Sequence, residues 1–385
     1  MLHYLKFFHY YLIVLIACAC LLMADTFIVV GFAIFISFYV VGDAFLGDDL
    51  SSPALKHKWL LNLMLYSALP LSLLVLTICA WLVTPSNWAI MTALSQLSGY
   101  DLVAAKANTG TLELALGVIF AGFMLSGVAT VVGHELVHRV GKRFDVSLGR
   151  WLMSLSFDAN FSIEHVYHHH AKVATTDDPV TAPRGRNVYV HIVYALWGTN
   201  KSAWLIEKKR LSRKKQNIFT LNNIFIRGWL MTLSFLIICA LIAGWQAALY
   251  TASVGIMAKL ILEVVNYMEH YGLVRHPRQA VKPKHSWNSN RKISNWAMFN
   301  LPRHSHHHAQ GAAPFEKLLP MPEAPEMISG YISTFGITLI PPLWFALMKP
   351  KLEEWDRVHA NAEELAILAS QQQARANNKF TALFQ

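Results

Sequence analysis

Hydrophobic residues gather into six long runs, and polar segments separate these runs along the chain. The runs cover residues 11–23, 26–41, 60–83, 112–132, 228–243 and 247–265. A helix needs about 20 mostly apolar residues to cross the hydrocarbon core of a bilayer. Only Ala24 and Asp25 separate the first two runs, and a turn at Gly244 and Trp245 separates the last two. The pattern therefore predicts an all-α integral membrane protein with about six transmembrane helices, in a single domain over residues 1–385.

Lysine and arginine residues are distributed unequally between the two sides of these predicted spans. Residues 86–111 contain one basic side chain, Lys106, whereas the loop 134–227 and the tail 268–385 contain many. The positive-inside rule places that loop, the tail and both termini on the cytoplasmic side of the inner membrane. The apolar stretch 331–348 contains Pro341 and Pro342, which predict a re-entrant or interfacial segment. Residues 353–385 are polar and are predicted to form a solvated helix or tail.

The composition agrees with a membrane protein and argues against other classes. The chain is 54% hydrophobic and 15% charged, too little charge to cover a soluble protein of this length. Its net charge of +10 comes from basic residues beside the spans, so no nucleic-acid partner is expected. The four cysteines lie in apolar runs without the C-x-x-C spacing of a zinc or iron site. No removable signal peptide is predicted.

Eleven of the eighteen histidines lie in four short segments, at residues 133–139, 164–170, 266–272 and 301–309. His134 and His138 stand four residues apart, which places both imidazoles on one face of a helix. The pair His165 and His169 repeats this spacing, and His304 stands three and four residues before His307 and His308, which also places them on one helix face. The fourth and sixth spans run directly into His134 and His270. The four segments are therefore predicted to meet at the cytoplasmic boundary of the membrane.

Neutral imidazole suits iron, copper, zinc or nickel, so these segments predict a metal site. Glu135, Glu164 and Glu269 stand beside the histidines, either to accept their second N–H or to bind metal directly. The motif H-E-x-x-H also occurs in zinc proteases, but a single zinc ion needs only about three protein ligands. Four segments offer enough histidines for two metal ions. The remaining histidines are expected at ordinary surface or interface positions: His3, His9, His57, His191, His276, His285 and His359.

At these residues the sequence resembles the membrane alkane 1-monooxygenase family, which includes the hydroxylase component of xylene monooxygenase. It resembles the membrane fatty-acid desaturases more distantly. The shared motifs are H-E-L-x-H at 134–138, E-H followed by H-H within 164–170, N-Y-x-E-H-Y-G-L at 266–273, and L-x-R-H-S-x-H-H-A at 301–309. Further matches lie at 173–175, 178–179 and 285–290, and the resemblance extends from the fourth span to Pro350. His168 stands where the family has glycine, and His306 where aspartate is frequent.

The resemblance implies two non-haem iron ions, with O2 as co-substrate, in a cytoplasmic histidine-rich di-iron site. The iron ligands it implies are His134, His138, His165, His169, His170, His270, His304, His307 and His308. The implied reaction is O2-dependent hydroxylation of a terminal or benzylic methyl group, with n-alkane to 1-alkanol as the first expectation. The implied partners are membrane lipids, a hydrophobic substrate from the bilayer, and an electron donor, either a rubredoxin or a flavin–iron–sulfur reductase. The basic residues Lys208 to Lys215 offer an acidic donor a docking site, although they also satisfy the positive-inside rule.

Several alternatives stay open at the level of sequence. A xylene-type hydroxylase is one, because residues 323–352 resemble the xylene-oxidising members. A fatty-acid desaturase would use the same di-iron site and give an alkene. A zinc protease conflicts with the surplus of histidines. A histidine-rich metal carrier would place polar ligands near the bilayer midplane, whereas the predicted spans are nearly free of them.

Overall fold

The computed structural model describes residues 2–377, and within this range the regular secondary structure is helical apart from two isolated β-bridges. Six helical segments are long and apolar enough to cross a membrane, which confirms the predicted architecture. They are His3–Met23, Thr26–Phe45, Lys58–Val83, Thr111–His138, Ile224–Ala243 and Trp245–His270. The first residue and the last eight, which belong to the predicted domain and tail, lie outside the described range.

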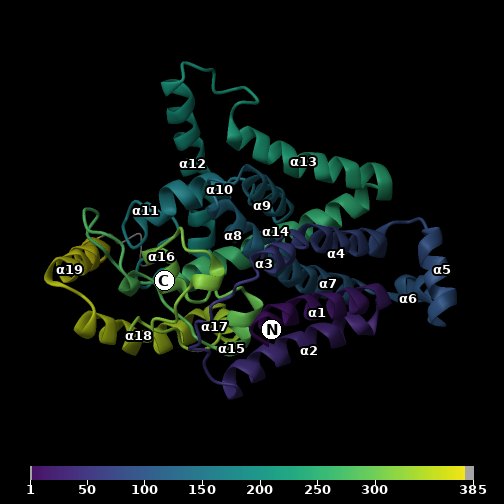
Figure 1. Cartoon of the computed structure of the whole chain (residues 1–385), viewed down its shortest axis with the longest axis horizontal. Coiled ribbons are helices and arrows are strands. Elements are labelled where there is room, and N and C mark those ends of the chain that lie inside the picture. Colours follow the sequence, from purple (N-terminus) through teal and green to yellow (C-terminus); the bar gives the residue numbers. More distant parts are fainter. Residues whose placement is uncertain (1, 378–385) are drawn as a thin grey trace.

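The spans form a bundle around the last of them (Figure 1). Helices α1 (Leu2–Met23) and α2 (Thr26–Phe45) form the predicted hairpin, and Ala24 and Asp25 adopt positive φ angles at its turn. The third span consists of α3 (Lys58–Tyr66) and α4 (Ala68–Val83). The fifth span, α13 (Ile224–Ala243), turns at Gly244 into α14 (Trp245–His270). Helix α14 packs against α4, α13 and α7 (Thr111–Leu125), and so forms the centre of the bundle.

The fourth span continues from α7 through a π-helical segment, η1 (Ser126–Val131), into α8 (Val132–His138). Helices α8 and α14 both end in the middle of the molecule, where α16 (His304–Ala309) and α11 (His170–Lys172) also lie (Figure 1). The short helices α5 (Ala89–Ser98) and α6 (Leu102–Asn108) lie at the opposite end of the bundle. The predicted convergence of the histidine segments at one end of the spans is therefore present.

The segment between the fourth and fifth spans surrounds this end of the bundle. It contains α9 (Arg143–Leu155), α10 (Phe161–Glu164), η2 (His165–His169), α11 and α12 (Val188–Arg213). Helix α9 packs on α8 and α13, and α12 packs on α10 and α14. After α14 come η3 (Pro283–His285), α15 (Lys292–Ala297), α16 and η4 (Phe315–Lys317). These short helices close the site from the side opposite η2.

The C-terminal segments are more ordered than the sequence predicted. The apolar stretch 331–348 is divided between α17 (Tyr331–Thr338) and α18 (Pro341–Val358), because Pro341 cannot continue the preceding helix. Helix α19 (Ala362–Asn377) was expected to be solvated, but its Glu364 is fully buried. Lys284 Nζ and His285 Nε2 lie 2.5 and 3.0 Å from the Glu364 carboxylate. The segment forms the predicted helix and most of its described side chains are exposed, but these ion pairs attach it to the domain.

The sixth span contains buried charged side chains, whereas the predicted spans were expected to be nearly free of polar residues. Lys259 and Glu263 lie within α14 and are almost completely buried. Lys259 Nζ is 2.7 Å from Glu263 Oε1 and 2.6 Å from Asp158 Oδ2. Charged side chains inside a membrane span are costly, and they persist where they are paired and face the protein interior.

Arg303 fixes the start of α16 to the rest of the domain. Its side chain is 1% exposed. One guanidinium nitrogen donates to Leu318 O at 2.6 Å, and another donates to Asp49 O and Ser51 O at 2.7 and 2.9 Å. Hydrogen bonds from a charged group are about twice as strong as neutral ones. Arg303 therefore joins α16 to the segment after α2.

We expect Arg303→Met to lower the free energy of unfolding by about 3 kcal/mol, since it removes several charge-assisted hydrogen bonds and leaves buried carbonyl oxygens without donors. The thermal unfolding of the purified protein in detergent tests this expectation. Arg213→Met is the matched control, because Arg213 is exposed at the end of α12. Equal melting temperatures for the two variants would contradict the assigned role of Arg303.

Candidate metal centre

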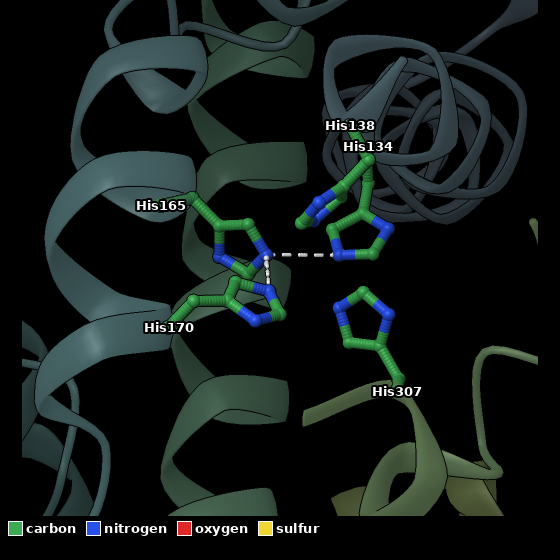
Figure 2. A group of neighbouring side chains, drawn as sticks. All are labelled: His134, His138, His165, His170 and His307. Carbon is green, nitrogen blue, oxygen red and sulfur yellow. Dashed lines mark hydrogen bonds between the residues drawn. The ribbon is translucent and has the colours of Figure 1, made fainter. Parts of the chain in front are cut away.

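The structure brings all nine predicted ligand histidines together in two adjacent groups. In each set of possible ligands, the candidate nitrogen or oxygen atoms lie within 4.8 Å of one another. Group one contains His134, His138, His165, His170 and His307 (Figure 2). Group two contains two sets that share His270, and its members are His169, His270, His304, His308 and Glu269.

The ring nitrogens within each group point at one another across short distances. In group one, His165 Nε2 lies 2.9 Å from His134 Nε2 and 3.1 Å from His170 Nε2. In group two, His304 Nε2 lies 3.2 Å from His270 Nε2 and 3.0 Å from His308 Nε2. Two ligands at right angles, each about 2.1 Å from a metal ion, have nitrogens about 3.0 Å apart. These spacings therefore fit imidazoles that converge on a shared cation.

Several buried ring nitrogens have no protein partner, which also fits a metal site. The Nε2 atoms of His138, His169 and His307 are buried and lack a hydrogen bond. Burial, reinforced by neighbouring histidines, lowers the pKa of His165, His170, His304, His307 and His308 well below the ordinary value. These imidazoles are therefore neutral at neutral pH, which is the form that binds metal.

The allocation of histidines to the two groups differs from the simple one-face expectation. His134 and His138 on α8 share group one, and His304 and His308 on α16 share group two, as a spacing of four residues predicts. His165 instead shares group one with His170, whereas His169 belongs to group two. Residues 165–169 form the π-helix η2, whose wider turn aligns residues five apart. The π-helix thus lets one segment supply ligands to both groups.

The other histidines lie outside both groups. His168 Nε2 lies 3.0 Å from Asp177 O, and His306 is 2% exposed with its Nδ1 unpaired. His191 and His285 were expected at the surface or at an interface, but both are completely buried. His191 Nε2 lies 3.1 Å from Val180 O, and His285 binds Glu364. Their burial is therefore explained by these hydrogen bonds and does not require a metal.

Two carboxylates contact histidines of group two. Asp178 Oδ2 lies 3.0 Å from His169 Nδ1 and fixes the ring so that Nε2 is directed away from it. Burial alone would raise the pKa of Asp178, but His169 and the hydrogen bond from Thr181 hold it below the ordinary value. Glu269 Oε2 lies 3.3 Å from His304 Nε2, and Tyr331 OH donates to Glu269 Oε1 at 2.8 Å. Asp178 was a motif match that the sequence did not single out as a site residue, and nothing in the sequence pointed to Tyr331.

The three glutamates singled out from the sequence have different environments. Glu269 is in group two, as described. Glu135 accepts hydrogen bonds from Arg139 Nε at 3.0 Å and from the Phe315 N–H at 3.1 Å, and it belongs to neither group. Glu164 is 4% exposed, and its Oε1 has no partner. Burial, followed by the charges of Asp178 and Asp158, raises the pKa of Glu164 well above the ordinary value.

We expect His307→Ala to lose the metal of group one, since it removes one of only five nitrogens that surround that position. His306→Ala is the matched control, because His306 is equally buried on the same helix but belongs to neither group. Metal content per chain, measured by plasma mass spectrometry after membrane extraction, distinguishes the two variants. Full metal content in His307→Ala would remove that residue from the ligand set.

We expect Asp178→Ala to weaken metal binding about 10- to 100-fold, because His169 then loses the carboxylate that orients its ring. The neighbouring Asp177→Ala serves as control, since Asp177 is exposed and pairs with Lys172 rather than with a histidine. Competition with a chelator of known affinity measures the difference. Equal metal retention by the two variants would show that Asp178 does not orient a ligand.

Comparison with known proteins shows which families this sequence is similar to. The family model described as fatty acid desaturase matches residues 110–326, which contain all nine histidines. An alkane 1-monooxygenase of Pseudomonas aeruginosa is 33% identical over 72% of this chain and 78% of its own length. An alkane 1-monooxygenase of Acinetobacter baylyi is 34% identical over 66% of this chain, and the chain spans 62% of that relative. The xylene/toluene monooxygenase hydroxylase component XylM of Pseudomonas putida is 35% identical over 70% of this chain and 75% of its own. The chain therefore belongs to the fatty acid desaturase superfamily and, within it, to the family of the alkane 1-monooxygenases.

Proposed function

We propose that this protein uses O2 to hydroxylate a terminal or benzylic methyl group of a hydrophobic substrate, with conversion of an n-alkane to a 1-alkanol as the leading reaction. The observation that carries the proposal is an apolar cavity that Tyr331 connects to the second histidine group. It lies between α1, α2, α7, η1, α14, α15 and α17, and aromatic side chains dominate its wall: Tyr10, Phe35, Tyr39, Phe123, Tyr331 and Phe335. Such a cavity binds hydrocarbon and excludes water.

Tyr331 connects this cavity to the metal centre. Its ring lines the cavity, while its hydroxyl donates to Glu269 beside His304. A methyl group held at this end of the cavity therefore lies next to group two. The cavity is also bordered by spans, so a substrate dissolved in the bilayer reaches it without crossing water. These contacts support a substrate that is apolar along its length and reacts at its end.

This set of histidine ligands favours a pair of iron ions. His134, His138, His165, His170 and His307 would hold one ion, and His169, His270, His304 and His308 the other, with Glu269 beside it. Two iron ions bound there supply the reduction of O2 and the insertion of one oxygen atom into a C–H bond. The overall reaction consumes two electrons and two protons for each O2, and gives one alcohol and one water. The protein's residues orient the methyl group, fix the ligands and keep bulk water away.

The electrons must come from a separate carrier, and we propose a rubredoxin-type protein or a flavin–iron–sulfur reductase. The basic run at residues 208–215 lies at the far end of α12 (Figure 1). Lys208 lies 20 residues after Val188 in this helix, which is a distance of about 30 Å along the helix axis. A donor bound only to this run would lie far from the histidines. The run is better explained by the positive-inside rule, which also supports a cytoplasmic face for the site in the inner membrane.

An alkyl-aromatic substrate is the second candidate. The six aromatic rings in the cavity wall can stack on an aromatic substrate. The relative named as a xylene/toluene monooxygenase component is as similar to this chain as the alkane monooxygenases are. A desaturation reaction is compatible with the same histidines, and only its product distinguishes it from hydroxylation.

We expect purified protein, given a reductase and a mixture of octane, hexadecane and p-xylene under 18O2, to place the label in a terminal or benzylic alcohol. Metal analysis of the same sample should give about two iron ions per chain. The preferred substrate in the mixture separates the alkane from the alkyl-aromatic reaction. His307→Ala is the control for metal-dependent turnover. Unlabelled alkene as the product would move the protein to the desaturases, and zinc without labelled product would refute an oxygenase.

A further inference from the structure

A second cavity reaches the histidines from the other side of α14, and its wall is polar. It lies between α10, α12 and α14, and its lining includes Asp158, Asn160, Glu164, His165, Asn200 and Lys259. None of these residues lines the apolar cavity. His165 belongs to group one, so the inner end of the polar cavity is at a candidate metal ligand. The polar cavity thus reaches group one through His165, whereas the apolar cavity is connected to group two through Tyr331 and Glu269.

Two different faces of helix α14 line the two cavities. Lys259, Glu263, Asn266 and His270 follow one another at intervals of four, three and four residues, so they form one polar stripe. Ile261 and Val265 lie on a different face and line the apolar cavity. The polar stripe is held by ion pairs, with Lys259 Nζ 2.6 Å from Asp158 Oδ2 and 2.7 Å from Glu263 Oε1. Asn266 Nδ2 also donates to Glu263 Oε2 at 3.2 Å.

Two buried oxygens in the wall of this cavity have no protein partner. Glu164 Oε1 and Asn160 Oδ1 lack hydrogen bonds, although each residue is only 4% exposed. Buried polar atoms without a protein partner are usually satisfied by an internal water molecule. Among the lining residues, Asn200 on α12 is the one that is more than marginally exposed. The mouth of the cavity therefore lies beside Asn200, and water is the occupant that its chemistry requires.

The proposed reaction needs a source of protons that the apolar cavity does not offer. Each turnover combines one C–H substrate, one O2, two electrons from the external carrier and two protons, and releases one alcohol and one water. The apolar cavity faces hydrocarbon, which supplies no protons. An imidazole nitrogen that binds a metal carries no proton that it could donate. Protons must therefore reach the centre by another route.

We propose that the polar cavity between α10, α12 and α14 is a hydrated channel that carries protons from solvent at Asn200 to the metal centre, with Asp158, which is paired with Lys259, as its proton-exchanging group. This inference rests on the proposed oxygenase function. Glu164 binds water at the inner end through its free oxygen. The charged and titratable groups that face Asp158 are Lys259 and Glu263 of α14 and Glu164 of α10. Burial raises the pKa of Asp158 although Lys259 opposes this shift, so the carboxylate is suited to take up a proton.

The hydration of the cavity is tested first, without reference to activity. Thr199→Cys places a thiol in the cavity wall, and Ala195→Cys places one a turn earlier on the same helix, where it is buried but does not line the cavity. Both variants, as full-length protein in membrane vesicles, are exposed to hydroxyl radicals, which X-ray radiolysis generates from bound as well as bulk water, and are analysed by mass spectrometry. We expect modification of Thr199→Cys and none of Ala195→Cys. The wild type is the blank, because its four cysteines lie in the spans. Unmodified Thr199→Cys would refute a hydrated cavity.

The role of Asp158 is tested in the iron-loaded protein. We expect Asp158→Asn to lower turnover per iron about 100-fold, as the loss of a positioned proton donor does. Asp158→Glu should restore most of the turnover, and the solvent deuterium isotope effect should rise in Asp158→Asn. Iron content and the KM for the hydrocarbon should stay unchanged, because Asp158 contacts neither a ligand histidine nor the apolar cavity.

The outcomes separate this inference from the proposed function. A wild type that gives no labelled alcohol would remove the oxygenase function, and the proton channel with it, whatever the radical labelling of the cysteine variants shows. An active wild type with unchanged turnover and isotope effect in Asp158→Asn would refute the channel alone. Loss of iron from both Asp158→Asn and Asp158→Glu would show that the pair with Lys259 is only structural, and would also overturn the proposal.

Discussion

The structure depends on one unfavourable arrangement, in which nine histidines converge and several pairs of their ring nitrogens lie about 3 Å apart. Each pair of such nitrogens can share at most one proton, and His165 Nε2 faces two neighbours at once. Burial prevents the rings from becoming charged and prevents water from satisfying all of them. A cation between the rings turns every one of these lone pairs into a ligand. The surrounding fold therefore holds a site whose geometry is favourable only with metal bound.

Much of the protein outside the histidines serves to hold this arrangement. Helices α8 and α14 deliver His134, His138 and His270 at the ends of two membrane spans that pack against neighbouring helices. Asp178 fixes the ring of His169, and Arg303 fixes the beginning of α16 just before His304. Rigid spans supply the ligands on one side, and short helices tied by buried hydrogen bonds supply them on the other. This division explains why the short segments carry so many buried polar side chains.

The features that depend on local periodicity could be predicted from the sequence. Hydrophobic runs predicted the six spans, and the spacing of four residues predicted that His134 and His138 share a group. The division of residues 165–170 between the two groups was not predictable, because a π-helix differs from an α-helix by one residue per hydrogen-bonded turn and leaves no clear sequence signal. Buried His285 and the attached α19 were also missed. Their partners are 79 residues apart, and a polar segment looks the same in sequence whether it is solvated or paired.

Helix α14 shows how one element can serve a reaction that needs both an apolar substrate and protons. Its apolar stripe, Ile261 and Val265, continues at the same interval of four to Glu269, which binds Tyr331 of the apolar cavity. Its polar stripe runs from Lys259 to His270 on another face. A lysine and a glutamate in a membrane span cost free energy that simple packing would avoid, since an apolar pair of similar volume is often at least as stable. Their retention beside a water-sized polar cavity is understandable if the two faces of α14 keep hydrocarbon and protons on separate routes to the same centre.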